Sequence, residues 1–166
     1  MSQEEWAIYH RHSIYRPTAT TNPRDTPLSL SSSYGYIPVV RALLAARANV
    51  NVLGGGNNWM PLQWASAYGH GDVVGELVAA RADVNYVGGE NRRSALSIAA
   101  RNGHVEVVAR LLEAVNIRVD LGDQFGQAPL HWAAANGRGA VMDLLLEARA
   151  DAGARTNATM LSTGHS

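Results

Sequence analysis

The chain has 166 residues with a formal net charge of zero, and 46% of them are hydrophobic. This length is typical of one domain, and the neutral charge balance gives no general attraction to nucleic acid or to anionic membranes. The sequence contains no cysteine, which excludes disulfides and cysteine-based zinc sites. The N-terminal residues are too polar for a signal peptide, and no apolar run approaches the roughly 18 residues of a membrane span. We therefore expect an intracellular protein, cytoplasmic or nuclear, that does not enter a membrane.

Residues 1–23 form an extension ahead of any repeated pattern. The segment Ser2-Gln-Glu-Glu5 has the form of a helix capping box, and Trp6 and Tyr9 lie one helical turn apart. Residues 17–23 begin and end with proline, which is typical of a linker. The extension is a short helix on the first repeat, a disordered segment or an arm that binds a partner.

A period of 34 residues begins near residue 24 and runs through most of the chain. Two kinds of residue keep this step, a leucine (Leu28, Leu62, Leu96 and Leu130) and a glycine (Gly35, Gly69, Gly103 and Gly137). Two positions locked to one period indicate an internal repeat. The predicted repeat domain covers residues 24–157, as repeats 24–57, 58–91, 92–125 and 126–157, followed by a tail at 158–166.

Each repeat is predicted to contain two short helices. The first begins at a Pro-Leu pair, where proline suits the first helical position, and Thr26 and Ser94 stand where a hydroxyl can cap the helix. The repeated glycine ends it. The second helix carries apolar pairs such as Val73-Val74 with Leu77-Val78, a spacing that predicts one wide buried stripe. A stretch rich in glycine and asparagine follows, and it predicts a turn or a short two-stranded finger.

Three segments carry a family resemblance: Ala128-Pro-Leu-His-Trp-Ala-Ala-Ala-Asn-Gly137, Gly103-His-Val-Glu-Val-Val108 and Ala82-Asp-Val-Asn85. They resemble ankyrin repeats, and the resemblance implies an all-α solenoid of four helix-turn-helix repeats with short hairpin-like fingers. It also implies that His70, His104 and His131 form hydrogen bonds that tie repeats together. The family period is about 33 residues. We place the extra residue of this chain near residues 54–57 and, between the third and fourth repeats, near Asn116-Ile117.

The family usually ends its second helix with a glycine in a left-handed conformation. The matching residues here are Arg47, Arg81, Val115 and Arg149. A residue with a side chain costs about 1 kcal/mol in that conformation. We therefore predict a left-handed backbone at these four positions.

The last repeat resembles an inner one, because Val141-Met142 and Leu144-Leu-Leu146 are apolar where an end cap is normally polar. Either the tail to Ser166 folds over this end, or the chain is part of a longer array.

No grouping of residues indicates catalysis. No Ser/His/Asp grouping stands out beyond chance, and no paired carboxylates share a helix face in a pocket-like context. His10 and His12 could bind a metal adventitiously, but no further residues support a site. Arg92, Arg93 and Arg101 form too small a cluster for nucleic-acid binding. We expect no enzyme activity, no cofactor, no metal and no nucleic acid.

The resemblance implies a concave surface for a partner protein, made by the fingers and by the residues before each turn glycine. The partner-binding residues predicted there are Tyr34, Trp59, Tyr68, Arg93, Arg101, Asn102, Phe125, Gln127 and Asn136. Tyr34 and Tyr68 should form a ladder that Asn102 and Asn136 continue. Trp59 could instead fold back to cover the neighbouring finger, and Trp64 and Trp132 are predicted to be core residues.

These features predict a monomeric protein–protein interaction module that scaffolds or recognises a partner without catalysis. The alternative is a regulatory or targeting segment of a larger enzyme or channel.

Overall fold

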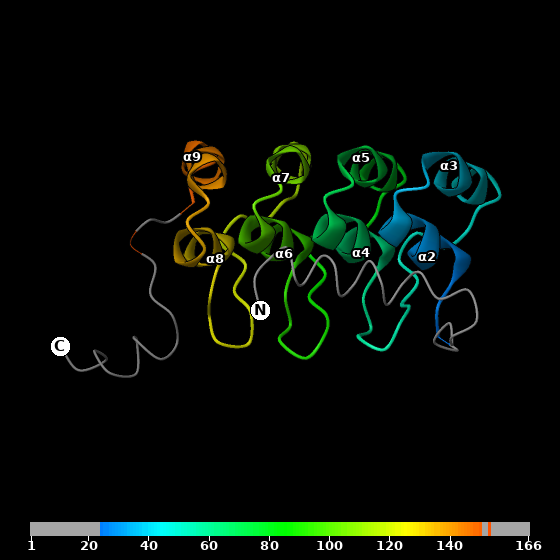
Figure 1. The fold of residues 1–166 in the computed structure, drawn as a ribbon, viewed down its shortest axis with the longest axis horizontal. Coiled ribbons are helices and arrows are strands. Elements are labelled where there is room, and N and C mark those ends of the chain that lie inside the picture. The colour runs from blue at the N-terminus through cyan, green and yellow to red at the C-terminus, as the bar shows by residue number, and fades with distance from the viewer. Residues whose placement is uncertain (1–23, 151–152, 154–166) are drawn as a thin grey trace.

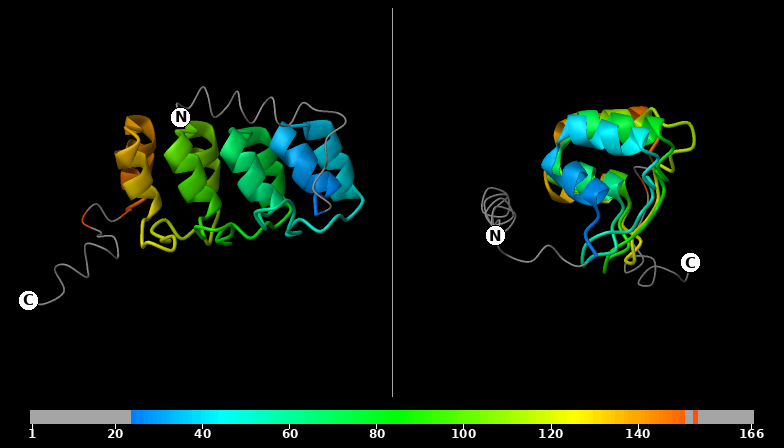
Figure 2. Two further views of the ribbon diagram at one scale, coloured as in Figure 1. Left: turned by 60° about the horizontal axis from the view of Figure 1, so that its bottom comes forward. Right: turned by 90° about the vertical axis from the view of Figure 1, so that its right-hand side faces the viewer.

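The computed structural model describes residues 24–150 and 153, so the expectations for residues 1–23 and 158–166 lie outside it. The helices of the described residues form two layers (Figure 1). The inner layer, next to the fingers, contains α2 (Pro27–Tyr34), α4 (Pro61–Tyr68), α6 (Ala95–Asn102) and α8 (Pro129–Ala135). The outer layer contains α3 (Ile37–Ala45), α5 (Gly71–Ala79), α7 (Val105–Leu112) and α9 (Gly139–Glu147). The four pairs stack along one axis, which confirms the predicted α-solenoid (Figures 1 and 2).

The inner helices begin where the sequence predicts, each with a different side chain at its N-terminus. Thr26 Oγ1 accepts a hydrogen bond from Ser29 N at 3.1 Å, and Ser94 Oγ accepts one from Ser97 N at 3.1 Å. At α4 the buried Gln63 accepts from Met60 N at 2.9 Å and donates Nε2 to the carbonyl of Arg93 at 2.7 Å. Gln63 therefore ties its helix to the next finger as well as satisfying the helix start.

A left-handed glycine ends three of the inner helices. Gly35, Gly69 and Gly103 have φ of 74°, 77° and 74°. A Cβ atom on Gly35 would lie 2.6 Å from the ring of His70, and one on Gly69 would lie 2.7 Å from the ring of His104. Backbone conformation and the neighbouring histidine thus both require glycine at these turns.

The core lies between the two helical layers and runs through all four pairs. Leu28, Leu62 and Leu96 are almost completely buried. Burial of each such side chain contributes about 2 kcal/mol.

The prediction of one wide buried stripe on the second helix of each repeat is confirmed for the inner repeats, and it is wrong for the first and last described repeats. Val73 and Val74 are both fully buried, whereas the equivalent Val39 of α3 is 47% exposed. We infer that the first residue of each pair packs against the preceding repeat and the second against the following one, because the members that lose burial are those at the two ends of the described stack. Met142 is the second residue of its pair in α9 and is only half-buried for the same reason.

The predicted left-handed residues after the outer helices are confirmed at three positions. Arg47, Arg81 and Arg149 have φ of 61°, 67° and 66°. Val115 has no positive φ, so that prediction is wrong: α7 ends at Leu112, and the next residue, Glu113, is right-handed with φ −74°. The extra residue predicted near Asn116-Ile117 lengthens this turn, and the longer turn reverses the chain without a left-handed residue.

The fingers project from the inner helices (Figure 2). Isolated antiparallel bridges join Gly54 to Trp59 and Gly88 to Arg93, which confirms two hairpin-like fingers. The third finger is shorter and closes through Asp123 N to the carbonyl of Gln127 at 3.0 Å. The second finger has the same length as the first, so the extra residue expected at 54–57 is present in both fingers.

Candidate partner-binding surface

Hydrogen bonds between repeats hold the residues before each turn glycine in place. His70 Nε2 lies 2.9 Å from the carbonyl oxygen of Ser33, and His104 Nε2 lies 3.0 Å from that of Ala67. In the last repeat Arg138 replaces the histidine and donates Nε to the carbonyl of Arg101 at 3.3 Å. The predicted ties of His70 and His104 are thus present, whereas His131 accepts a hydrogen bond from Ala128 N in its own repeat.

A row of aromatic rings crosses the second repeat on the side of the fingers. The rings of Trp59 and Trp64 meet edge to face with centroids 4.9 Å apart, and Trp64 stacks on Tyr68 at 6.5 Å. The row continues from Tyr68 to His70 at 6.4 Å. All four side chains are half-buried, so each ring combines packing against a neighbour with an exposed edge or face.

Trp59 folds back over the neighbouring finger, as the alternative interpretation of the sequence predicts. Its indole lies against the second finger, where Nε1 would be 2.6 Å from a Cβ on Gly89. It also lines a cavity of about 120 Å³ between the first two fingers, together with Asn57, Gly88, Gly89, Glu90, Asn91 and Arg93. Trp59 therefore covers the neighbouring finger and still contributes to the surface.

Trp64 and Trp132 are not core residues, and this prediction is wrong. Both are half-buried on the surface beside the fingers. They lie one turn before Tyr68 and Asn136 on the same helix face, a spacing of i, i+4 that was visible in the sequence. The core prediction came from Ile98, which occupies the same repeat position in α6 and is only 5% exposed.

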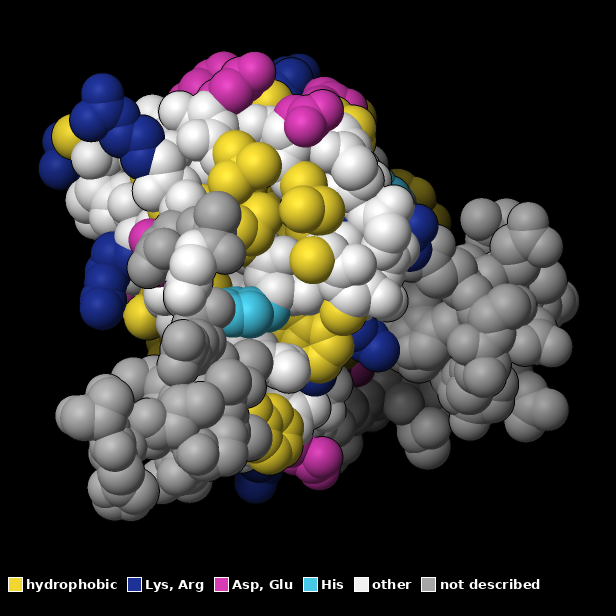
Figure 3. Space-filling view, turned by 90° about the vertical axis from the view of Figure 1, so that its left-hand side faces the viewer, with side chains coloured by type: hydrophobic (Ala, Val, Ile, Leu, Met, Phe, Trp, Pro, Cys, Tyr) yellow, Lys and Arg dark blue, Asp and Glu magenta, His cyan; other side chains and the backbone are white. Residues whose placement is uncertain are grey.

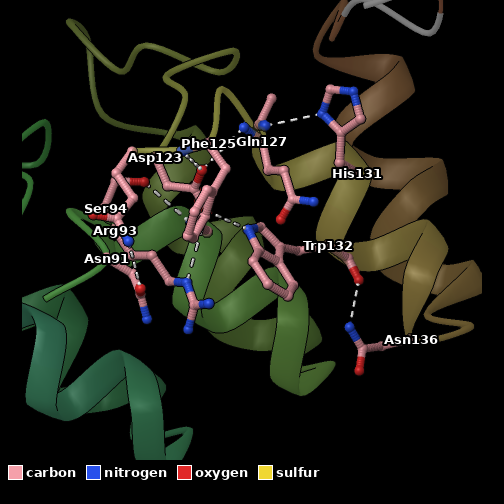
Figure 4. Close-up of polar contacts among 12 residues, drawn as sticks. Asn91, Arg93, Ser94, Asp123, Phe125, Gln127, His131, Trp132 and Asn136 are labelled. Carbon is pink, nitrogen blue, oxygen red and sulfur yellow. Dashed lines mark hydrogen bonds and ion pairs between the residues drawn. The ribbon is translucent and has the colours of Figure 1, made fainter. Parts of the chain in front are cut away.

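Arg93, Asp123 and Trp132 form a compact cluster between the second and third fingers (Figure 4). Arg93 Cζ lies 4.2 Å from the centroid of the Trp132 ring, and Trp132 donates Nε1 to Asp123 Oδ2 at 3.1 Å. The other carboxylate oxygen of Asp123 accepts from the backbone N–H groups of Phe125 and Gln127 at 2.9 and 3.0 Å. Burial lowers the pKa of Arg93, the positive charge of Arg101 lowers it further, and Asp123 opposes this shift.

Tyr34 and Tyr68 lie near one another at equivalent positions of adjacent repeats. Burial raises the pKa of Tyr68 to about 12, and the proximity of Tyr34 adds to the shift. The ring of Tyr34 stacks on Tyr36 at 5.2 Å rather than continuing a single row of rings.

The two asparagines in the equivalent positions use their amides to bind backbone carbonyls. Asn102 donates Nδ2 to Ala67 O at 3.2 Å in the preceding repeat, and Asn136 donates to Trp132 O at 2.8 Å in its own helix. The structure places the remaining predicted residues on the same side: Phe125 at the tip of the third finger is 52% exposed, Arg101 is exposed and Gln127 is half-buried.

The end of the stack at α8 and α9 presents hydrophobic side chains beside the acidic residues of the outer layer (Figure 3). On α9, Leu146 is 42% exposed and Met142 is half-buried. This face matches the expectation that the last repeat resembles an inner one.

Within the described residues, no three or more histidine, aspartate or glutamate side chains come together as metal ligands. None of the described helices is both long and apolar enough to cross a membrane.

Comparison with known proteins gives one family. The family model for ankyrin repeats (3 copies) matches residues 7–88 and 83–156. No curated protein matches the chain. Ankyrin repeats are generally protein–protein interaction modules, and the family is typically non-catalytic. With the family model matching most of the chain and the fold an α-solenoid of helix pairs, the protein belongs to the ankyrin-repeat family.

Proposed function

We propose that this protein binds a partner protein through its concave surface, the surface formed by the fingers and the adjoining inner helices, and that it does so without catalysis, cofactor or metal. One observation carries the proposal. Trp59, Trp64, Tyr68, Arg101 and Trp132 gather on this surface with their side chains half-buried or exposed.

These residue types explain why the surface suits recognition. Tryptophan, tyrosine and arginine are the side chains that contribute most to binding at protein interfaces. Their rings are already packed on one another, and hydrogen bonds between repeats hold the backbone beneath them. A partner would therefore bind without first ordering this surface, which reduces the entropic cost of association.

The outer helices offer a different surface. Two ion pairs neutralise charges there, Arg41 with Glu76 at 2.8 Å and Arg110 with Glu106 at 3.2 Å. Exposed hydrophobic residues such as Val39 and Val105 lie on separate helices there rather than in stacked rows. The contrast favours the finger side as the contact surface.

The proposal is tested by comparing two double variants as bait in extracts of the source cells. On the finger side we choose Arg101→Glu with Phe125→Ser, because both side chains are exposed. The matched control on α7 is Arg110→Glu with Val105→Ser, which reverses an exposed arginine and removes an exposed apolar side chain from the outer layer. Captured proteins are identified by mass spectrometry, and circular dichroism verifies that each bait is folded.

We expect the wild type and the outer-layer variant to capture the same protein, and the finger-side variant to lose it. Equal capture by all three baits would contradict binding through the concave surface. Loss with the outer-layer variant alone would move the contact to the outer helices.

A further inference from the structure

Two guanidinium groups share the ring of Trp132. Arg93 Cζ lies 4.2 Å and Arg101 Cζ lies 5.4 Å from the ring centroid. Arg93 comes from the second finger and Arg101 from the last turn of α6, so two segments bring their positive charges to one point. Both side chains are positioned by the ring before any ligand arrives.

The carboxylate of Asp123 is the acidic group in this cluster, and its bonds are already committed. Its oxygens accept two backbone N–H groups and the indole N–H of Trp132. Arg93 Nε is 3.8 Å from Asp123 Oδ2, which is an ion pair but too long for a hydrogen bond. In the part of the chain that the structure describes, no carboxylate forms an ion pair with Arg101. Arg93, Arg101 and Asp123 together thus carry one more positive charge than negative charge.

The surrounding inner helices do not compensate this charge. None of α2, α4, α6 and α8 contains an aspartate or glutamate, and Arg101 is the charged residue among their side chains. The acidic residues of the helices lie in the outer layer, on α5, α7 and α9. Glu90 lies on the other side of Arg93, in the cavity between the first two fingers. An anion approaching Arg101 from the concave surface therefore meets positive charge.

We propose that the partner presents an acidic, extended peptide segment, and that a carboxylate of an aspartate or glutamate in it binds at Arg101 and Arg93 beside the ring of Trp132. Guanidinium groups bind carboxylates through paired hydrogen bonds, and stacking on an aromatic ring leaves their N–H edges free to do so. On α4, which packs against the helix α6 that carries Arg101, the stacked rings of Trp64 and Tyr68 provide a surface for apolar side chains of the same peptide segment. This inference rests on the proposed function and specifies the chemistry of its partner.

The test is a selection of random 12-residue peptides displayed on phage, carried out in parallel against four forms of the full chain. The forms are the wild type, Arg101→Glu, Arg101→Gln and the control Arg110→Glu, which reverses an exposed charge on α7. Arg101 is chosen over Arg93 because its side chain is exposed and its replacement leaves the packed cluster intact. Peptides selected on the wild type are then synthesised, and their dissociation constants for the four forms and for the single variant Phe125→Ser are measured by fluorescence anisotropy.

We expect aspartate or glutamate to be enriched in peptides selected on the wild type and on Arg110→Glu. Selection on Arg101→Glu should replace this preference by lysine or arginine. Arg101→Gln should weaken binding of the acidic peptides roughly tenfold, the effect of losing about one charge-assisted hydrogen bond.

Two results would contradict the inference in distinguishable ways. In the first result, the selected peptides bind the wild type, do not bind the Phe125→Ser variant and show no preference for acidic residues. This result would contradict the carboxylate site and would still support the proposed function. If no peptide is selected that depends on either Phe125 or Arg101, both the carboxylate site and the proposed function are contradicted.

Discussion

Arg47, Arg81 and Arg149 hold backbone angles that glycine adopts without steric cost. Each follows an outer helix, and Arg47 and Arg81 turn the chain toward the next finger. An arginine there places its Cβ close to the following carbonyl oxygen, which costs about 1 kcal/mol. Arginine at these three equivalent positions thus lowers the stability of the fold relative to glycine.

We expect Arg81→Gly to raise the melting temperature by about 3 °C, because about 1 kcal/mol of strain is relieved in a domain of this size. Thermal unfolding followed by circular dichroism measures the change. Val115→Gly is the matched control, because Val115 lacks a positive φ and gains nothing from glycine. A melting temperature that falls or stays constant for Arg81→Gly would contradict the argument.

A second residue-scale effect concerns the charge of His104. Burial lowers the pKa of its ring, the hydrogen bond to Ala67 opposes the shift, and His70 and Arg138 add repulsion. The unfolded chain then binds a proton more readily than the folded one, so stability is lost as pH falls below about 6.5. We expect the melting temperature to fall between about pH 7.5 and pH 5.5.

In His104→Gln the side chain retains a donor for the Ala67 carbonyl and does not titrate, so the fall in melting temperature should be smaller. The same pH series measures both proteins. Identical slopes for the two would show that His104 does not contribute to the pH dependence.

At the scale of the helices, stability comes from close contact between adjacent inner helices. Ala99 and Ala100 of α6 are completely buried. Such small side chains allow α4, α6 and α8 to pack closely, and a larger side chain at these positions forces the backbones apart.

Ala100→Trp should therefore destabilise the protein by about 3 kcal/mol or prevent folding. Ala134→Trp is the control, because Ala134 is the equivalent residue in α8 and is exposed. Urea unfolding of the two variants makes the comparison. Equal stability of Ala100→Trp and the wild type would mean that the packing between α4, α6 and α8 is not as described.

At the scale of the whole molecule, the described repeats form a linear array in which helices pack mainly within a repeat and against the adjacent repeats. The inner repeats contact a repeat on both sides, whereas the described repeat at α8 and α9 contacts one. Local opening should therefore begin at the ends of the array.

Hydrogen–deuterium exchange measured by mass spectrometry tests this expectation. Amides of α4 to α7 should exchange most slowly, and those of α8 and α9 more quickly. Uniform protection across all four helix pairs would contradict the gradient and indicate that the array opens as one unit.

The sequence by itself determined the repeat, its period, the helix pairs and the turn glycines, because these depend on local backbone preferences and on periodic burial. It also identified Tyr68, Arg101 and Phe125 as residues of the finger side. Tertiary structure alone decided which member of each valine pair is buried at the ends, since that depends on whether a neighbouring repeat is present. It likewise decided that Trp132 lies on the surface beneath Arg93 and Arg101, because three segments distant in sequence must meet to form that contact.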